Sequence, residues 1–507
     1  MDNEGVGSWL ARRCRRSAAK RAIIFQGEET TYGELLDRSD RLANALVARG
    51  VGKGDRVAFL GENQPAYIEV MFAVGTIGAI YVPLNTRLTV PELHYQLTDS
   101  GATALIFAPT HDGQSLAAAR DTDVRTLIRV GEGAEAPVEN YEEVLAASSS
   151  EHLDVRVTRD DPALIIYTSG TTGSPKGALL THGNLTFSAV NFIVDYDVAS
   201  DDIMLLNSPL FHIASLGHGL LPFILKGGSL IVEAGFNAPR VLELIERHKV
   251  TQLTGVPTTY QMLAEDPAWE TTDLSSVRSL ACGGSAVPVR VIEAYAAKGL
   301  AFSGGYGMTE TAPGATSLSP QRVVIGSSGQ SHFFTDVRIR TSDNQPCEVG
   351  EVGEIQVQGP NVIKEYWQKP EASKAAFADG VWFRSGDMGY FDEESFIFIS
   401  DRLKDMIISG GENIYPAEIE RVILELPQVA DVAVIGIADD RWGEVPRAVV
   451  QVKEGAVLSE DEVIAHMQGR LARYKQPKAV RFLGAFPRTA SGKIRKNELR
   501  ANPEIVD

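Results

Sequence analysis

The segment Ile165-Ile166-Tyr167-Thr168-Ser169-Gly170-Thr171-Thr172-Gly173-Ser174-Pro175-Lys176-Gly177 joins an apolar run to a run of Thr, Ser and Gly. Residues 164–167 predict a buried strand, and the polar residues behind it cannot build a core. Their glycines permit positive φ, so backbone N–H groups and hydroxyls can converge into an anion cradle, to which Lys176 adds a positive charge. A mobile surface linker has a similar composition. We favour phosphate binding, because a linker seldom follows a buried strand directly or ends in Pro-Lys-Gly.

The bulk composition bounds the class of protein. A chain of 507 residues is too long for one hydrophobic core and predicts two or three domains. Its 44% of hydrophobic and 22% of charged residues are ordinary for a soluble globular protein. The net charge of −18 argues against general nucleic-acid binding, which needs a basic surface. A small anionic ligand needs only a locally positive field and stays compatible with this charge.

Targeting signals and cysteine patterns are absent from the sequence. Cys14, Cys282 and Cys347 show no disulfide or zinc spacing and fit a reducing compartment, so we expect a cytoplasmic protein. The N-terminus lacks the apolar segment of a signal peptide. The apolar run 70–84 contains glycines and a proline and is too short to span a bilayer. For the basic cluster at 12–21 we favour a solvated helix face over contact with anionic lipid.

Strand and helix patterns alternate along residues 1–320. The expected strands are 22–25, 56–60, 79–82, 103–107, 204–207, 229–232, 252–254, 277–281 and 301–305. The expected helices are 31–46, 65–75, 93–96, 239–247 and 288–297, with an apolar helix over 214–225 that ends at Gly227-Gly228. Thr31, with Glu34 three residues on, predicts a cap at the start of the first. This alternation predicts two α/β subdomains with mostly parallel sheets and helices on both faces.

The pattern of predicted strands and helices changes after residue 322. Short strands at 336–341, 353–357 and 395–399 predict a small β-rich subdomain, and a dense run of charge follows at 401–405. The remaining residues suffice for a small α+β domain. The expected fold class is therefore α/β, with a large N-terminal domain of two α/β subdomains plus a small β-rich subdomain, followed by a small mobile α+β C-terminal domain.

Further polar motifs follow predicted strands. In Tyr306-Gly307-Met308-Thr309-Glu310, an aromatic ring could stack on a base, and a hydroxyl and a carboxylate suit Mg²⁺; the alternative is an ordinary turn with a helix cap. Asp387 follows a glycine turn and could accept hydrogen bonds from ribose hydroxyls, or form an Asx turn. Residues 401–413 combine charge, a strand and a Gly pair, which a solvated interdomain linker does not need. Lys493, taken alone, is an exposed surface lysine.

Together these segments resemble the AMP-forming acyl-CoA synthetases of the adenylate-forming superfamily. That superfamily includes fatty-acid, 4-coumarate and feruloyl CoA ligases, firefly luciferase and the adenylation domains of peptide synthetases. The resemblance covers essentially the whole chain, and the motifs occur in the family's order at 167–177, 305–310, 383–387, 401–416 and 491–493. It implies a two-step reaction: a carboxylic acid and ATP give acyl-AMP and pyrophosphate, and the thiol of coenzyme A then displaces AMP.

The resemblance also implies residue roles. The cradle would hold the phosphates of ATP through Thr168, Ser169, Gly170, Thr171, Thr172, Gly173 and Lys176. Adenine and the α-phosphate would meet Gly284, Tyr306, Gly307, Met308 and Thr309, with Glu310 on Mg²⁺ and with Asp387 and Arg402 on the ribose. The cradle lacks the Gly-Lys-Ser/Thr helix start of P-loop NTPases, so Lys176 is assigned to holding ATP. We expect this loop to be poorly ordered without ligand, because only the ligand satisfies its N–H groups.

Catalysis and domain motion are implied in the same way. Lys493 would bridge the carboxylate and the α-phosphate, with His212, Thr309 and Glu310 completing the catalytic set. The N-terminal domain would span residues 1–402 and the C-terminal domain 403–507, with the hinge at Lys404. Rotation about the hinge would remove Lys493 and form the tunnel for CoA from Ser409, Gly410, Gly411 and Glu412.

The acyl pocket is the least specified part of the site. The resemblance puts His212 at its mouth and lines it with Ala214, Ser215, Gly217, Gly283 and Gly305. Ala214 stands where plant 4-coumarate ligases carry a Tyr that meets the phenol, so a medium- or long-chain fatty acid and a differently held aromatic ring both remain open. Residues 208–219 contain no Asp or Glu, which argues against an amino-acid substrate. For His218 we favour a satisfied core histidine over a polar group of the pocket.

Two other functions stay open. One is an adenylating enzyme that loads a carrier protein, and the other is a non-catalytic member of the fold. The presence of Lys176, Glu310, Asp387, Arg402 and Lys493 argues against the second. The expected partners are a small-molecule carboxylic acid, ATP and CoA, without nucleic acid; monomer and homodimer are both compatible with the sequence.

Overall fold

The computed structural model divides into two compact units, Met1–Val337 with Val357–Phe383 (unit 1) and Arg338–Gln356 with Arg384–Asp507 (unit 2). The structure describes residues 2–168, 175–283, 287, 289–319, 322, 324–402, 405–409, 412–439, 442–468, 470–471, 473–488 and 493–506. For residues 401, 402, 408, 412, 413, 443 and 474 it describes the main chain alone.

The first sheet of unit 1 has eight strands in the order β19-β9-β8-β4-β3-β5-β6-β7. Its strands are β3 (Arg56–Leu60), β4 (Ile80–Leu84), β5 (Ala104–Phe107), β6 (Thr126–Arg129), β7 (Glu139–Asn140), β8 (Pro162–Thr168), β9 (Lys176–Thr181) and β19 (Glu365–Tyr366). The strands from β8 to β7 pair in parallel, whereas β9 turns back antiparallel on β8. The crossover helices are α3 (Pro65–Thr76), α4 (Val90–Ser100), α5 (Asp112–Ala118) and α6 (Tyr141–Ala146). The predicted α/β alternation is confirmed.

The second sheet has seven strands in the order β14-β13-β12-β10-β11-β1-β2. Its strands are β1 (Arg21–Phe25), β2 (Glu28–Thr31), β10 (Ile203–Leu206), β11 (Ser229–Val232), β12 (Gln252–Gly255), β13 (Ser279–Cys282) and β14 (Phe302–Gly304). The N-terminal hairpin β1–β2 belongs to this sheet, because β1 pairs in parallel with β11. The two subdomains are therefore not consecutive pieces of chain, a feature that the order of predicted elements does not reveal.

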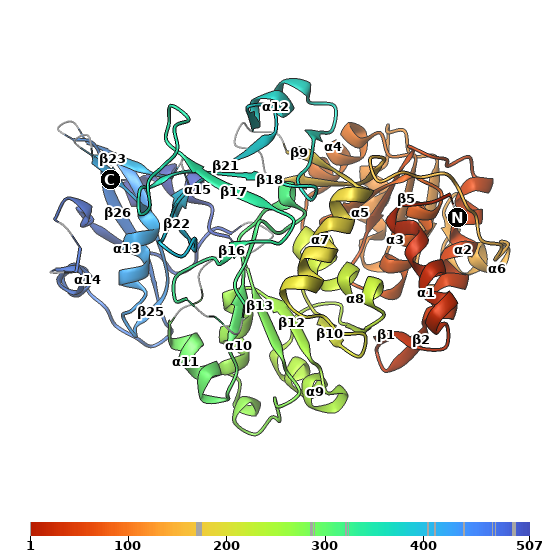
Figure 1. Cartoon of the computed structure of the whole chain (residues 1–507), viewed down its shortest axis with the longest axis horizontal. Helices are drawn as coiled ribbons and strands as arrows, with labels where there is room; N and C mark the ends of the chain where they lie inside the picture. Colours follow the sequence, from red (N-terminus) through yellow and green to blue (C-terminus); the bar gives the residue numbers. More distant parts are fainter. Residues whose placement is uncertain are drawn as a thin grey trace. The chain divides into compact units, whose positions relative to one another are not determined.

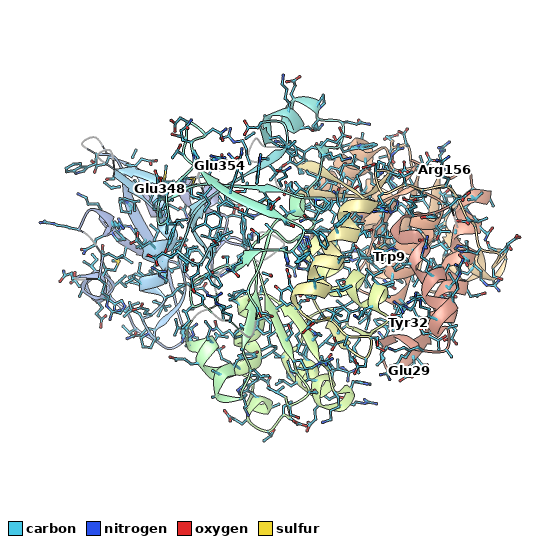
Figure 2. The ribbon with its side chains drawn as sticks, in the orientation of Figure 1. Trp9, Glu29, Tyr32, Arg156, Glu348 and Glu354 are labelled. Atoms are coloured by element: carbon cyan, nitrogen blue, oxygen red, sulfur yellow. The ribbon has the colours of Figure 1, made fainter. Side chains whose placement is uncertain are left out.

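Helices cover this second sheet and link it to the first. They are α1 (Trp9–Ser17), α2 (Tyr32–Ala48), α7 (His182–Asp195), α8 (Leu221–Lys226), α9 (Ala238–His248), α10 (Pro257–Ala264) and α11 (Val289–Ala297). Figure 1 shows α9, α10 and α11 gathered around β12 and β13, where their apolar side chains form one buried cluster. Trp9 and Tyr32 lie in the same part of unit 1 (Figure 2), and the Tyr32 hydroxyl donates to the Gly228 carbonyl at 2.7 Å.

Local sequence explains where several of these helices begin. Thr31 caps α2 as predicted: its hydroxyl accepts from the Glu34 amide at 3.2 Å, and the Glu34 carboxylate accepts from the Thr31 amide at 2.7 Å. Thr181 and Asn184 form the same reciprocal pair at the start of α7. These pairs satisfy amides that a helix start otherwise leaves without partners.

The predicted helix over 214–225 has two parts. Its first half is a π-helix, η3 (Ala214–Leu220), and α8 follows directly and ends at Gly227, whose φ is +87°. Pro222 has no N–H to donate back into the preceding turn, and its ring crowds that turn, so a regular α-helix cannot run through this point undisturbed. The helix and its Gly stop were predicted, but the π register was not.

The basic cluster at 12–21 is only partly solvated. Arg13 donates to the Leu225 carbonyl and Lys20 to the Gly227 carbonyl, at the C-terminal end of α8, where cations are favoured. Arg15 and Arg16 are exposed. The prediction of a solvated face therefore fails for the two side chains that bind this helix end. Within the described ranges, no helix combines the length and the hydropathy needed to cross a membrane.

Three further sheets follow in the described part of the chain, the smallest being the pair of β15 (Thr316–Ser317) and β16 (Gln330–Ser331). Another has the order β17-β18-β21-β20, with β22 paired to β21; its strands are β17 (Asp336–Arg340), β18 (Gly353–Gln358), β20 (Phe377–Ala378), β21 (Trp382–Phe391) and β22 (Ile397–Arg402). The third has the order β24-β23-β26-β25, with β27 on β26; its strands are β23 (Ile407–Ser409), β24 (Glu412–Ile414), β25 (Val429–Asp439), β26 (Gly443–Val452) and β27 (Val480–Phe482). The accompanying helices are α12 (Pro370–Ala375), α13 (Pro416–Ile423), α14 (Glu460–Met467), α15 (Lys496–Arg500) and α16 (Pro503–Val506). The predicted β-rich and α+β parts are both present.

Candidate active site

The cradle segment closes the antiparallel hairpin of β8 and β9. Thr168, the last residue of β8, lies opposite Lys176, the first residue of β9, and its hydroxyl donates to the Lys176 carbonyl at 3.4 Å. The predicted phosphate-binding residues 169–173 lie outside the described residues, and so does the expectation about their order. The described ends of the hairpin show that a buried strand leads directly into the loop, as predicted.

Two residues of α4, Asp99 and Tyr95, hold the two ends of the loop in this hairpin. The Asp99 carboxylate, 10% exposed, accepts from the Tyr167 hydroxyl at 2.8 Å and from Nζ of Lys369 at 3.0 Å. Tyr95, one turn earlier on α4, donates its hydroxyl to the Pro175 carbonyl at 3.0 Å. Trp367 donates its indole N–H to the Asp99 carbonyl at 3.0 Å. The loop between Thr168 and Pro175 thus has fixed ends.

A row of side chains joins Lys176 to the motif at 306–310. Nζ of Lys176 lies 5.4 Å from the centre of the Tyr366 ring, within the range of a cation–π contact. The Tyr366 hydroxyl donates to Oε1 of Glu310 at 2.8 Å. Burial and the nearby Glu310 charge raise the pKa of Tyr366 above its usual value, so it keeps the proton that it donates. The structure therefore brings together two residues that the sequence assigned separately, and it adds Tyr366 between them.

The motif at 306–310 lies on a tightly folded loop. Gly307 faces the Pro313 carbonyl so closely that a Cβ would overlap it, and a Cβ at Gly305 would overlap the Thr316 carbonyl. Thr309 and Glu310 begin a short 3₁₀ turn, η5 (Thr309–Thr311). The Tyr306 amide donates to the Thr316 hydroxyl at 2.9 Å. Both glycines are thus required by the close approach of two backbone segments.

Two buried asparagines position this loop by donating to main-chain carbonyls. Nδ2 of Asn361, which is 0% exposed, donates to the carbonyls of Thr311 and Gly314 at 2.8 and 2.6 Å. Asn184 on α7 donates to the carbonyls of Pro360 and Val362, at 2.9 Å each. Replacing such a side chain would leave buried carbonyls without partners. No sequence pattern identifies these residues, because their partners lie far away along the chain.

The predicted acyl residues lie along and beside η3. Ala214 is exposed, His212 is partly exposed and Ser215 is buried. Gly217 packs against the next segment of the site, since a Cβ there would lie 2.7 Å from Cδ of Pro313. Gly283, at the end of β13, has open space where a Cβ would be, and Gly284 lies outside the described residues. The missing side chain thus leaves space at Gly283, whereas at Gly217 it allows another segment to pack closely.

His212 has a positioning residue that sequence reasoning missed. Asn63 accepts from the Leu210 amide at 2.8 Å and donates to the Ser208 carbonyl at 2.8 Å. It thereby fixes the turn that leads into His212. Asn63 lies just beyond the carboxyl end of β3, where parallel strands of an α/β sheet present site residues, and that position is the signal that could have identified it.

In unit 2, Asp387 and Arg402 occupy directly opposite positions on β21 and β22. Asp387 is 6% exposed, and its amide donates to the Ser385 hydroxyl at 3.0 Å. Only the main chain of Arg402 is described. The resemblance assigns both residues to one ribose, although they are fifteen positions apart in the sequence. They are thus neighbours across one pair of antiparallel strands.

The remaining predicted residues also lie in unit 2. Ser409 pairs with Glu412 across the β23–β24 hairpin. Gly410 and Gly411, predicted for the CoA tunnel, and Lys404, the predicted hinge, lie outside the described residues. Lys493 is exposed and directly precedes Ile494, which bridges to Arg488.

Glu310 is the candidate ligand for Mg²⁺. Among the described residues, no group of three or more His, Cys, Asp or Glu side chains is arranged to hold a metal ion. A donor set of one carboxylate fits Mg²⁺, which binds through one or two carboxylates and completes its shell with water and substrate phosphates. The hydrogen bond from Tyr366 occupies Oε1 and orients the carboxylate.

Comparisons with known proteins agree with this arrangement. The AMP-binding enzyme family matches residues 10–367, and the AMP-binding enzyme C-terminal domain matches residues 418–493. A feruloyl-CoA synthase from Amycolatopsis sp is 49% identical, and the match covers 99% of each chain. Long-chain-fatty-acid–CoA ligase FadD13 from Mycobacterium tuberculosis is 37% identical over 98% of each chain.

A solved structure shows the same fold. ATP-bound MatB from Rhodopseudomonas palustris superposes with a TM-score of 0.92 at 33% identity, and the match covers 98% of each chain. Together with the two family matches, this similarity extends over both units. The chain therefore belongs to the AMP-binding enzyme family and is an ATP-dependent acid–CoA ligase.

Proposed function

We propose that this ligase activates an aromatic acid of the hydroxycinnamate type, such as ferulate. The proposal rests on η3, which would form one wall of the acyl pocket. Ala214 leaves space on its accessible face, and the imidazole of His218, on the same face, lies 4.7 Å from the Phe192 ring. A planar substrate could pack against this imidazole, because aromatic groups prefer offset or tilted contacts with one another. The 49% identity to a feruloyl-CoA synthase supports the same substrate class.

On the ATP side, we assign the hairpin loop to the β- and γ-phosphates. Thr168, Lys176 and the loop between them would hold the leaving pyrophosphate, and Thr309 and Glu310 would meet the α-phosphate. Mg²⁺ held by Glu310 would neutralise charge on the phosphates. Tyr366 would keep the Glu310 carboxylate oriented, and its ring would support the Lys176 ammonium. Tyr306 would stack on adenine, and Asp387 and Arg402 would bind the ribose hydroxyls.

In the first step a carboxylate oxygen of the acid bonds to the α-phosphorus, and the bond to the β-phosphate oxygen breaks. Two anions must meet, so positive charge has to be present where the new charge develops. Lys493 would supply that charge and position the carboxylate. In the second step the sulfur of CoA attacks the acyl carbon and AMP leaves. We assign this step to a rotation of residues 403–507 about Lys404 that withdraws Lys493 and brings Ser409–Glu412 to the site.

A fatty acid is the second candidate. Ala214 is exposed and presents no polar atom, so an alkyl chain also fits this face, and one relative at 37% identity is named for long-chain fatty acids. The two candidate substrates differ in what they require of the side chains on this face of η3. An alkyl chain gains nothing from His218, whereas a substituted ring does.

Pyrophosphate release with a panel of acids tests the proposal. We expect the highest kcat/KM with ferulate and 4-coumarate, and AMP release that depends on added CoA. A maximum at long-chain fatty acids would favour the second candidate. AMP release that needs a carrier protein and ignores CoA would contradict transfer to CoA, and flat signals across C2–C18 acids and cinnamates would contradict the whole proposal.

A further inference from the structure

Three buried polar side chains form a continuous chain of hydrogen bonds from α7 to the loop that carries Glu310. Nδ2 of Asn191, on α7, donates to the Thr335 hydroxyl at 3.0 Å, and this hydroxyl donates to Oδ1 of Asn361 at 2.8 Å. Asn191, Thr335 and Asn361 are 1, 4 and 0% exposed. Nδ2 of Asn361 donates to two main-chain carbonyls of the loop, so the chain of bonds ends there.

The direction of these bonds is fixed by their outer partners. Oδ1 of Asn191 accepts from the Phe334 amide at 2.9 Å, so the Asn191 nitrogen has to face Thr335. A hydroxyl has one proton, which Thr335 therefore gives to Asn361. By contrast, Nε2 of His218 has no hydrogen-bond partner among the described residues, so the prediction that His218 is a satisfied core histidine is wrong for this atom. A buried polar network whose members are paired makes its surroundings rigid.

The segment that Asn361 holds contains a strained residue. Ala312 has φ +57°, in the left-handed region that residues with a Cβ rarely adopt, and it is 0% exposed. Asn361 donates to the carbonyls of Thr311 and Gly314, which lie on either side of Ala312. Such a backbone persists only where its surroundings hold it, and it is concentrated at functional sites. The strain therefore indicates a role for Asn361 beyond stability.

Both arms of the loop are bonded to residues assigned to ATP. On one arm, the Ala315 amide donates to the Tyr306 carbonyl at 2.8 Å. On the other side, the Ile363 amide, two residues after Asn361, donates to the Glu310 carbonyl at 2.9 Å. A shift of Asn361 would therefore move the backbone of Tyr306 and Glu310 together.

The helix at the other end of the chain of bonds belongs to the cradle hairpin. β9 begins at Lys176 and ends at Thr181, which caps α7. Asn184, in the first turn of α7, donates to the carbonyls on both sides of Asn361, at 2.9 Å each. One helix thus connects the strand of Lys176 with the loop of Glu310.

We infer that Asn191, Thr335 and Asn361 are positioning residues for adenylation: they hold the loop so that Thr309 and Glu310 meet the α-phosphate and Mg²⁺. None of the three is a catalytic residue, because each acts through the loop. The inference rests on the proposed role of this loop in binding ATP, and it does not depend on which acid the enzyme prefers.

Thr335→Val tests the inference, because it removes the hydroxyl and keeps the shape of the side chain. We expect kcat for ATP–pyrophosphate exchange to fall about ten- to a hundredfold, the effect of displacing reacting groups by about an ångström. The KM for MgATP should stay within about threefold of wild type, because the lost contact belongs to the transition state. Thr335→Ser keeps the hydroxyl and should retain kcat within about threefold. The acid used is the one that gives the highest wild-type rate.

Thr76→Val is the matched control. Thr76 is 3% exposed on α3, in another part of unit 1, and its hydroxyl donates to the Phe72 carbonyl at 2.8 Å. This variant should lower the thermal midpoint and leave kcat within about twofold of wild type. Asn191→Asp serves if Thr335→Val does not fold. Its carboxylate still accepts from the Phe334 amide but takes the Thr335 proton, so Asn361 loses its donor and the same fall in kcat is expected.

The outcomes separate the inference from the proposed function. A kcat of Thr335→Val within threefold of wild type, or equal falls in Thr335→Val and Thr76→Val, would overturn the inference. An equal fall in Thr335→Ser would also overturn it, because the hydroxyl would then not be the group that matters. Glu310→Gln is measured alongside, and a wild-type kcat in that variant would instead overturn the proposed role of the loop in binding ATP.

Discussion

Tyr366 shows how one residue can connect motifs that are separate in sequence. It lies on β19, which pairs with β9, and so reaches both Lys176 and Glu310. Lys176 and Glu310 follow predicted strands in conspicuous motifs, whereas Tyr366 has no such context. Its role depends on a strand pair between residues almost two hundred positions apart, which no local pattern encodes.

Tyr366→Phe isolates the contribution of the hydroxyl. The substitution keeps the ring under Lys176 but removes the donor to Glu310, so we expect kcat/KM for MgATP in adenylation to fall about tenfold, the scale of one hydrogen bond to a charged group. ATP–pyrophosphate exchange over a range of Mg²⁺ concentrations measures it, and higher Mg²⁺ should recover part of the loss. Tyr141→Phe is the control, because its hydroxyl donates to the Glu69 carboxylate at 2.7 Å in another part of unit 1. Equal losses in the two variants would contradict a specific role for Tyr366.

His182 links stability to pH. It is buried at the start of α7, its Nδ1 accepts from the Val6 amide at 3.2 Å, and burial lowers its pKa to about 4. Because the unfolded chain binds this proton near pH 6.5, the stabilisation is complete above pH 6.5 and is lost as the pH falls toward 4. The loss from this residue reaches about 2 kcal/mol at pH 5, at 1.36 kcal/mol per unit.

The measurement for His182 is the thermal midpoint of wild type and His182→Asn at pH 7 and pH 5. The Asn side chain does not titrate, so the advantage of wild type at pH 7 should shrink at pH 5. A difference between the two proteins that stays constant over this range would contradict the assignment.

Among the secondary-structure elements, the strands and helices of the two α/β subdomains follow from the spacing of hydrophobic residues and from capping residues. Thr31 with Glu34 predicts the start of α2, and the apolar run before Thr168 predicts β8. The π register of η3 does not follow, because it depends on how Pro222 and the packing of Gly217 against Pro313 act together. The membership of β1 in the second sheet depends on its long-range pairing with β11.

The role of Asp99 in the β8–β9 hairpin can be tested by substitution. Asp99→Asn removes the charge that fixes Lys369 and weakens the acceptor of Tyr167, which loosens the β8 end of the loop. We expect the KM for ATP to rise about five- to twentyfold, on the scale of a buried charge-assisted bond, with the KM for the acid unchanged. Initial rates with each substrate varied in turn measure both constants. Asp40→Asn, at another buried carboxylate, is the control, and equal rises in both KM values would contradict a role in holding the loop.

At the scale of the whole molecule, the sequence predicts two functions for two parts of the chain. The family matches cover 10–367 and 418–493, and the proposed catalytic lysine lies in the second part. The Asp387–Arg402 pair was predicted only as a shared ligand contact, and the β21–β22 register adds that the two positions are neighbours. The preferred acid could not be predicted, because the small residues at 214 and 217 leave both an alkyl chain and an aromatic ring open.

Lys493→Ala separates the two half-reactions. We expect it to abolish adenylation, because nothing else in the proposal offsets the charge between carboxylate and α-phosphate, and to leave thioester formation from supplied acyl-AMP within about threefold of wild type. Pyrophosphate release measures the first step, and acyl-CoA formation from acyl-AMP measures the second. Equal loss of both would show that Lys493 is misassigned.

A competition experiment decides between an aromatic acid and a fatty acid as the preferred substrate. Purified enzyme is given ATP, Mg²⁺, CoA and equal concentrations of ferulate, 4-coumarate, cinnamate and a long-chain fatty acid, and the acyl-CoA products are quantified at early times by mass spectrometry. Because all acids compete for one site, the product ratios equal the ratios of kcat/KM. We predict that feruloyl-CoA and 4-coumaroyl-CoA exceed cinnamoyl-CoA and the fatty acyl-CoA by about tenfold or more. A product mixture dominated by the fatty acyl-CoA would contradict the account.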